Sequence, residues 1–199
     1  MSAASAWLST AVAVLAILAG AFLPSAGVGP GGEGDGEIAA SLGVLAATGI
    51  AIVVALRLWA LRLGRAAVAP VALRFDAMLV AIGLVFAASQ YALAVGGGVW
   101  SAPAGRWTVI ALALLVFCLG WVSAGIGRNR FVGFRTPRTL ADDAAWRAAN
   151  QRFGRALMLL SPASLLGLFA GGGWGPAIAL LPAFVVAVAF LVSDRRAPR

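Results

Sequence analysis

The chain has 199 residues, of which 62% are hydrophobic and 11% are charged. A typical soluble domain has about 45–50% apolar residues, so this sequence cannot cover its apolar surface with a polar coat. Its fifteen basic residues, all arginine, outnumber seven acidic residues and give a net charge of +8. The composition excludes a soluble globule. It predicts a partnership with the lipid bilayer, including anionic lipid at the cytoplasmic face, and no direct binding of nucleic acid.

The residue types also limit the chemistry that the protein performs. The sequence contains no histidine and no lysine, and its single cysteine, Cys118, lies in an apolar stretch. One cysteine forms neither an internal disulfide nor a multi-cysteine metal site. Histidine is the side chain that ordinarily titrates near neutral pH, and it is absent. We therefore expect a protein that is not an enzyme, with no catalytic residues, no metal and no cofactor.

Six segments approach the roughly 20 apolar residues that a membrane-spanning helix needs. In chain order they are residues 7–23, 38–56, 75–95, 107–126, about 156–170, and 177–192. The fifth segment is too short to span a membrane unless it begins within the polar helix that precedes it. We predict an all-α, polytopic membrane helical bundle with about six transmembrane helices, in which residues 1–199 form a single integral membrane domain.

The first segment has an alternative interpretation as a cleaved signal peptide, because Pro24-Ser25-Ala26 follow it. It has no basic residues before its apolar part, and this favours an uncleaved first helix. With the N-terminus inside, all but one of the fifteen arginines fall in cytoplasmic loops or the C-terminal tail, and the exception is Arg106. Because arginine collects on the cytoplasmic side of membranes, we expect both termini to be cytoplasmic.

A long polar stretch, residues 127–155, separates the fourth and fifth segments; we call it the signature segment. Gly133 permits a tight bend, and Pro137 stiffens the backbone around it. Thr139, followed three residues later by Asp142, predicts a capping box and a helix that begins near Leu140. We expect one short interfacial cytoplasmic helix here, with Asp143 paired to Arg147 four residues on and Trp146 on one side with Asn150 and Phe153.

The signature segment resembles the SdpI family of bacterial membrane proteins, which is named after an immunity protein against a secreted peptide toxin. The residues that match the family pattern are Asn129, Gly133, Arg135, Thr136, Pro137, Thr139, Leu140, Trp146 and Gly154. With its flanking segments, the resemblance covers residues 75–192. Arg138 stands where the family usually has an aromatic or similar residue, and Ala149-Asn150 stand where it commonly has Thr-His.

The resemblance implies a multi-pass protein of the bacterial inner membrane that confers resistance to, or senses, a membrane-active peptide. Its implied partners are a peptide toxin and a cytoplasmic repressor held at the membrane. The implied recognition surface lies in the signature segment, with Asn129, Gly133, Arg135, Thr136, Pro137, Thr139 and Trp146 as candidate binding residues.

Two candidate residues have competing interpretations. The guanidinium of Arg135 suits bidentate binding of a carboxylate or phosphate, but it also suits an internal structural clamp. Trp146 is interpreted as an interfacial anchor or packing residue in preference to a ligand platform. Topology alone is one of two open explanations, beside a functional role, for the arginines at positions 128, 130, 138, 152 and 155.

Two other functional classes stay open. A small transporter would need polar groups or broken helices at the membrane midplane, and the sequence offers Ser89-Gln90, Pro162 and Pro182. Asp76 lies beside Arg74, with which a surface ion pair is expected instead of a proton relay. The other class is an accessory subunit of a larger membrane complex.

Overall fold

The structure is a computed structural model that describes residues 3–22, 35–62, 68–94, 102–129, 133–170 and 174–196. These residues contain helices and connecting segments but no strand, which confirms the all-α prediction. The elements are α1 (Ala3–Phe22), α2 (Asp35–Arg62), the 3₁₀ helix η1 (Ala69–Val71), α4 (Ala72–Ala94), α5 (Ala102–Ser123), α6 (Pro137–Ala141), α7 (Asp143–Leu160), the 3₁₀ helix η2 (Ser161–Phe169) and α8 (Gly175–Arg196).

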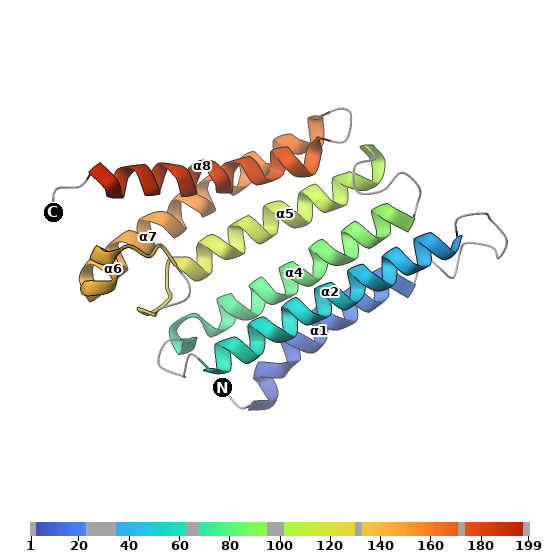
Figure 1. The fold of residues 1–199 in the computed structure, drawn as a ribbon, viewed down its shortest axis with the longest axis horizontal. Coiled ribbons are helices and arrows are strands. Elements are labelled where there is room, and N and C mark those ends of the chain that lie inside the picture. The colour runs from blue at the N-terminus through green and yellow to red at the C-terminus, as the bar shows by residue number, and fades with distance from the viewer. Residues whose placement is uncertain are drawn as a thin grey trace.

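The long helices run side by side in alternating directions and form two halves (Figure 1). In the first half, α1 and α2 pack on α4 and on each other. In the second half, α7, η2 and α8 pack on α5 and on one another. The contact between α4 and α5 joins the halves. The signature segment therefore belongs to the second half, directly after α5.

Four helical stretches are long and apolar enough to cross a membrane: Ile38–Arg62, Ala69–Ala94, Gly105–Ser123 and Gly175–Ser193. They correspond to the second, third, fourth and sixth predicted segments. The apolar helix at Trp7–Phe22 is shorter. Large apolar side chains such as Leu159 and Phe169 are 79% and 85% exposed, as expected when lipid is the solvent of the outer surface. The chain is a membrane protein with a helical bundle fold.

The fifth predicted segment is the continuation of α7. Leu160 and Ser161 both have right-handed helical backbone angles, so α7 passes into η2 without a break. Pro162 lies in the first turn of η2, where its missing N–H is tolerated. The second part of α7 packs on α5, where Gly154 and Leu157 lie against Gly120, and its apolar continuation leads away from the signature segment. In place of one short helix, the signature segment thus contributes the five-residue α6 and most of α7.

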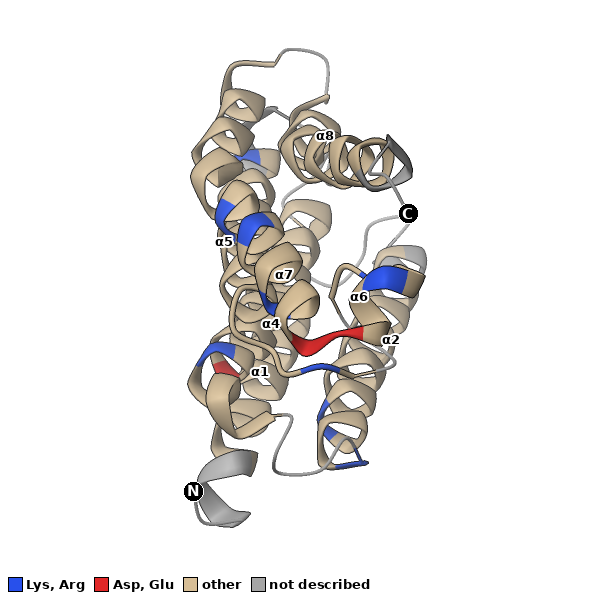
Figure 2. Cartoon of the chain, turned by 90° about the vertical axis from the view of Figure 1, so that its left-hand side faces the viewer, with Lys and Arg blue, Asp and Glu red and all other residues tan. Residues whose placement is uncertain are grey.

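The start of α1, the end of α2, the start of α4, α6 and the end of α8 lie at the same end of the bundle (Figure 1). Figure 2 looks onto this end, with arginine positions in blue. Arg62, Arg74, Arg128 and Arg138 belong to the helices and loops that meet here, whereas Arg106 is in the first turns of α5 at the opposite end. We call this end the arginine-rich end.

Candidate functional site

The signature segment begins with a capped helix. Thr136 is the N-cap of α6: its Oγ1 accepts a hydrogen bond from the Thr139 backbone N–H at 3.3 Å, and Thr139 Oγ1 accepts one from the Thr136 N–H at 2.8 Å. Pro137 occupies the first turn, where proline fits a helix start. Both threonines are buried. The capping box predicted between Thr139 and Asp142 is therefore wrong, since Thr139 closes the box with Thr136.

Asp142 caps a second helix, α7. Its backbone is extended, and its carboxylate accepts hydrogen bonds from the N–H groups of Ala145 at 2.9 Å and Ala144 at 3.2 Å. These two backbone hydrogen bonds lower the pKa of Asp142 below its ordinary value. The neighbouring Asp143 forms an exposed salt bridge with Arg128, at 2.7 Å between Oδ1 and Nε, in place of the predicted pair with Arg147.

Trp146 joins the signature segment to the end of α5. Its side chain is fully buried, and its indole Nε1 donates a hydrogen bond to the backbone carbonyl of Ile126 at 2.9 Å. Ile126 follows α5 by three residues and is buried itself. Trp146 is thus a packing residue, as the sequence indicated, and its ring offers no exposed platform to a ligand.

Asn150 holds the bend that precedes α6. Its Oδ1 accepts a hydrogen bond from the Phe134 N–H at 2.7 Å, and its Nδ2 donates to the Trp146 carbonyl at 3.1 Å. Asn150 is 1% exposed. We did not predict this role, although the spacing of four residues from Trp146 placed both side chains on one side of the helix. An amide side chain suits this role because its oxygen accepts a hydrogen bond while its nitrogen donates one.

At two glycines of the signature segment, Gly133 and Gly154, neighbouring atoms leave no room for a side chain. Gly133 has a φ of +107°, and a Cβ at this position would lie 3.1 Å from the Trp146 ring and closer still to the Asn150 amide oxygen. A Cβ on Gly120 of α5 would lie 2.7 Å from the Gly154 carbonyl oxygen. The backbones of α5 and α7 are therefore in direct contact, which side chains at Gly120 or Gly154 would prevent.

The seven candidate binding residues thus fall into three groups by burial. Thr136, Thr139 and Trp146 are buried and support the local fold. Asn129 and Gly133 are partly buried, and Asn129 Nδ2 donates to the Gly127 carbonyl at 2.9 Å. Only Arg135 and Pro137 of the seven are exposed.

An open groove of about 340 Å³ lies between α6, α7 and the end of α8. We call it the arginine groove, because two of its lining residues are arginines. It is lined by Phe134, Arg138, Thr139, Ala145, Ala148, Ala149, Arg152, Phe190 and Ser193. Topology was one of two open explanations for Arg138 and Arg152, and the sequence did not indicate that they share a groove.

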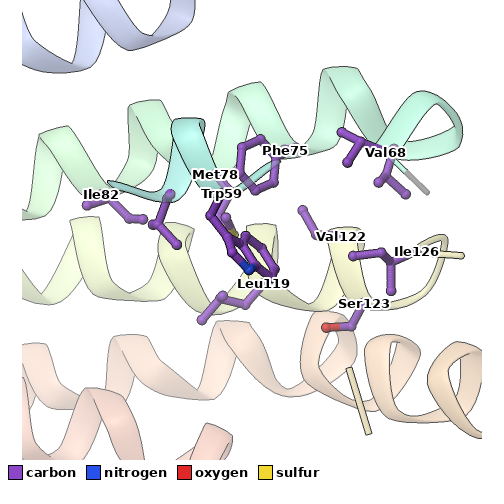
Figure 3. Close-up of a pocket in the computed structure, with 11 residues that line it drawn as sticks. Trp59, Val68, Phe75, Met78, Ile82, Leu119, Val122, Ser123 and Ile126 are labelled. Atoms are coloured by element: carbon purple, nitrogen blue, oxygen red, sulfur yellow. The ribbon is translucent and has the colours of Figure 1, made fainter. Parts of the chain in front are cut away.

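An apolar cavity of about 170 Å³ lies among α2, α4 and the end of α5 (Figure 3). Trp59 of α2, Phe75 and Met78 of α4, and Val122 of α5 point toward it in Figure 3. Its wall also includes Ile126, whose carbonyl binds Trp146. Trp146 also belongs to the same buried apolar cluster as the cavity residues Phe75, Met78 and Val122, so the cavity wall is continuous with the signature segment.

A buried polar cluster holds the first half together. Arg57 of α2 forms a salt bridge with Asp76 of α4, and its Nε and Nη2 donate to Thr10 Oγ1 at 2.9 Å and Ser9 Oγ at 2.6 Å, both on α1. The guanidinium also lies 5.5 Å from the centre of the Phe75 ring. Sequence reasoning missed this cluster because it ended the second span at residue 56, whereas α2 continues to Arg62.

The expected ion pair between Arg74 and Asp76 is therefore wrong. Arg74 Nη1 instead donates to the Trp121 carbonyl at 3.2 Å, and its guanidinium lies 5.6 Å from the centre of the Trp121 ring. This contact joins α4 to α5. Asp76 also accepts a hydrogen bond from Ser9 Oγ at 2.9 Å.

Ser89 and Gln90 of the third span also form hydrogen bonds with backbone groups of the protein. Ser89 Oγ donates to the Val85 carbonyl at 2.8 Å. Gln90 is fully buried, and in the amide orientation that satisfies both of its ends it donates to the Ile17 carbonyl at 2.8 Å and accepts from the Ala46 N–H at 3.2 Å. Among the residues searched, no three His, Cys, Asp or Glu side chains are grouped so that they would hold a metal ion.

Residues 126–193 match the SdpI/YfhL protein family. Neither a curated protein nor a solved structure matches the chain. The matched range begins at Ile126, which binds Trp146, and ends at Ser193, which lines the arginine groove. Residues 126–193 of this membrane protein therefore belong to the SdpI/YfhL protein family.

Proposed function

We propose that the chain is a non-enzymatic SdpI-type protein of the bacterial inner membrane that confers resistance to, or senses, a membrane-active peptide. In this proposal it also holds a cytoplasmic regulator at the membrane. The observation that carries the proposal is the double role of Ile126: its side chain lines the apolar cavity, and its carbonyl binds the buried Trp146. A change in the cavity thereby reaches the signature segment.

The apolar cavity suits one or two apolar side chains of a peptide that enters the membrane. Its volume of about 170 Å³ resembles that of apolar protein cavities, about 150 Å³, that bind benzene. An occupant would press on Val122 and Ile126 at the end of α5. The close contact between Gly120 and Gly154 would transmit a displacement of α5 toward α7 directly to the α7 backbone.

The exposed part of the signature segment is the proposed surface for the cytoplasmic regulator. Arg135 and Pro137 are exposed next to the capped start of α6, and the buried Thr136 between them fixes the local backbone. A guanidinium in a fixed position binds carboxylates in two parallel hydrogen bonds. The gathering of arginines at one end of the bundle supports a cytoplasmic location for this surface and for both termini.

The first test compares Arg135→Gln with Arg147→Gln, which removes the same charge from an exposed arginine of α7. Bacteria that produce each variant at equal folded level are challenged with the secreted peptide toxin against which the family's namesake gives immunity. We expect the wild type and Arg147→Gln to survive better than cells without the protein, and Arg135→Gln to lose this protection. Equal survival of the Arg135→Gln and wild-type cells would contradict the recognition role.

The second test addresses the cavity. Ser123 lines it and is buried, so Ser123→Leu places additional apolar atoms in the space that the peptide would occupy. We expect this variant to fold, as judged by its elution as a single species in detergent, and to lose protection. Full protection by a well-folded Ser123→Leu protein would remove the cavity from the proposal.

A further inference from the structure

The arginine groove lies where the apolar parts of two helices end. The apolar stretch of α8 ends at Ser193, and both Phe190 and Ser193 line the groove. On α7, Arg152 lies one turn before the sequence becomes apolar at Ala156. The boundary between apolar and polar helix segments is the level at which lipid headgroups meet a membrane protein. The groove therefore lies at headgroup level at the arginine-rich end.

The groove presents two positive charges from different elements. Arg138 belongs to α6 and Arg152 to α7, and both are exposed. Among the side chains that the structure describes, neither takes part in a salt bridge, because Asp143 pairs with Arg128 and Asp142 caps α7. The two guanidinium groups are thus positioned to bind an anion.

Besides the two arginines, the groove is lined by Thr139 and Ser193 and otherwise by apolar side chains. The Phe134 and Phe190 rings meet edge to face, with 5.5 Å between their centres, and Phe153 packs on both at 5.9 and 5.4 Å. On α7, the groove is lined by Ala145, Ala148 and Ala149, whose small side chains leave its volume of about 340 Å³ open. A ligand in the groove therefore contacts two guanidinium groups as well as aromatic and aliphatic side chains.

We propose that the arginine groove binds an anionic phospholipid, with Arg138 and Arg152 on its phosphate group and with Phe134 and Phe190 against its glycerol and upper acyl chain. Guanidinium groups match phosphate oxygens in charge and in fork geometry. The apolar wall leads toward the apolar stretch of α8, so a molecule with a phosphate and an acyl chain satisfies both parts of the groove. An acidic peptide without apolar side chains satisfies only the cationic part.

The test uses the whole chain purified in mild detergent, with lipid binding followed by native mass spectrometry. Phosphatidylglycerol and phosphatidylcholine of identical acyl chains serve as the anionic and zwitterionic probes. We expect tighter binding of phosphatidylglycerol. Arg138→Gln and Arg152→Gln are each expected to weaken it about tenfold, the effect of losing one charge-assisted hydrogen bond. Arg147→Gln, an arginine of α7 that does not line the groove, is the matched control and should change binding by less than about twofold.

Four results would overturn the proposal. Equal binding of the two lipids would remove the anion preference, and equal loss in all three variants would indicate diffuse attraction to positive charge. Displacement of phosphatidylglycerol by a soluble acidic peptide at equal concentration would assign the groove to a protein partner. Inorganic phosphate is the remaining probe: weak competition is expected, and competition as strong as that of the lipid would exclude a role for the acyl chain.

A folding control keeps the test decisive. Each variant is compared with the wild type by its thermal unfolding midpoint in detergent. Arg152→Lys keeps the positive charge but loses the fork of donors, so we expect binding between that of the wild type and Arg152→Gln. Binding by Arg152→Lys as weak as that by Arg152→Gln, with unchanged unfolding midpoints, would contradict the charge-based explanation.

Discussion

The polar residues of the signature segment mostly bind the protein's own backbone. Thr136, Thr139, Trp146 and Asn150 are all buried, and each forms a hydrogen bond with a backbone group at a helix start, at the bend or just after the end of α5. These buried side chains therefore serve the local fold. Arg135 and Pro137 are exposed, and the buried residues around them hold their backbone in position.

Trp146→Phe tests the hydrogen bond to Ile126. Phenylalanine keeps an aromatic ring in the buried site but removes the N–H donor, which leaves the Ile126 carbonyl without this partner. We expect the free energy of unfolding to fall by about 1–3 kcal/mol, measured by denaturant unfolding in detergent. Trp107→Phe is the control, because Trp107 is 58% exposed and should tolerate the change. Equal effects of the two substitutions would contradict the role of Trp146.

At the scale of the elements, the sequence predicted helices well where apolar length decided the outcome. The second, third, fourth and sixth segments correspond to long apolar helices. The helix start in the signature segment was mispredicted, because Thr139 is spaced three residues from both Thr136 and Asp142. Pro137 at the first helical position favoured the box with Thr136, and Asp142 then capped a second helix.

The cap at Asp142 predicts a dependence of stability on pH. Hydrogen bonds from Ala145 and Ala144 favour the ionised carboxylate, so the folded-state pKa lies below the ordinary value of 3.8. A lowered pKa adds stability at pH values above 3.8, and this stability is lost as the pH falls through the folded-state pKa. We expect Asp142→Ala to have a lower thermal unfolding midpoint than the wild type at neutral pH. We also expect this midpoint to decrease less than that of the wild type when the pH is lowered.

Asp142→Asn separates the cap from the charge. Asparagine is as good an N-cap as aspartate but does not ionise. We expect this variant to unfold near the wild-type midpoint at neutral pH, with a smaller loss in acid, followed by circular dichroism at 222 nm. A wild-type loss of stability on acidification that persists unchanged in Asp142→Asn would assign the pH dependence to other carboxylates.

At the scale of the whole molecule, the alternating helices and the gathering of arginines at one end follow from hydropathy and charge. The side-chain contacts between helices do not, because they depend on how the helices are rotated against one another. Arg57 illustrates this: the charge pattern placed it in a loop, whereas the structure buries it between α1, α2 and α4. The contact between Arg74 and Trp121, which joins the two halves, could not be predicted from the sequence for the same reason.

The buried pair of Arg57 and Asp76 predicts a strong effect on assembly of the first half. Asp76→Asn removes the negative charge and leaves Arg57, which is 4% exposed, without its counter-ion. We expect a loss of about 3–5 kcal/mol in the free energy of unfolding. The double variant Arg57→Met and Asp76→Leu removes both charges and should be more stable than Asp76→Asn alone. If the double variant is less stable than Asp76→Asn, the explanation by an unpaired buried charge is contradicted, and the salt bridge itself stabilises the fold.

The orientation of the signature segment is the central claim, because the regulator surface and the proposed sensing both require it to face the cytoplasm. It is tested most directly by cysteine labelling in a Cys118→Ser background, with a membrane-impermeant maleimide applied to intact and then to lysed cells. Arg135→Cys lies at the arginine-rich end and Arg106→Cys at the opposite end. The account predicts that Arg106→Cys is labelled in intact cells and Arg135→Cys only after lysis. Labelling of Arg135→Cys in intact cells would contradict it.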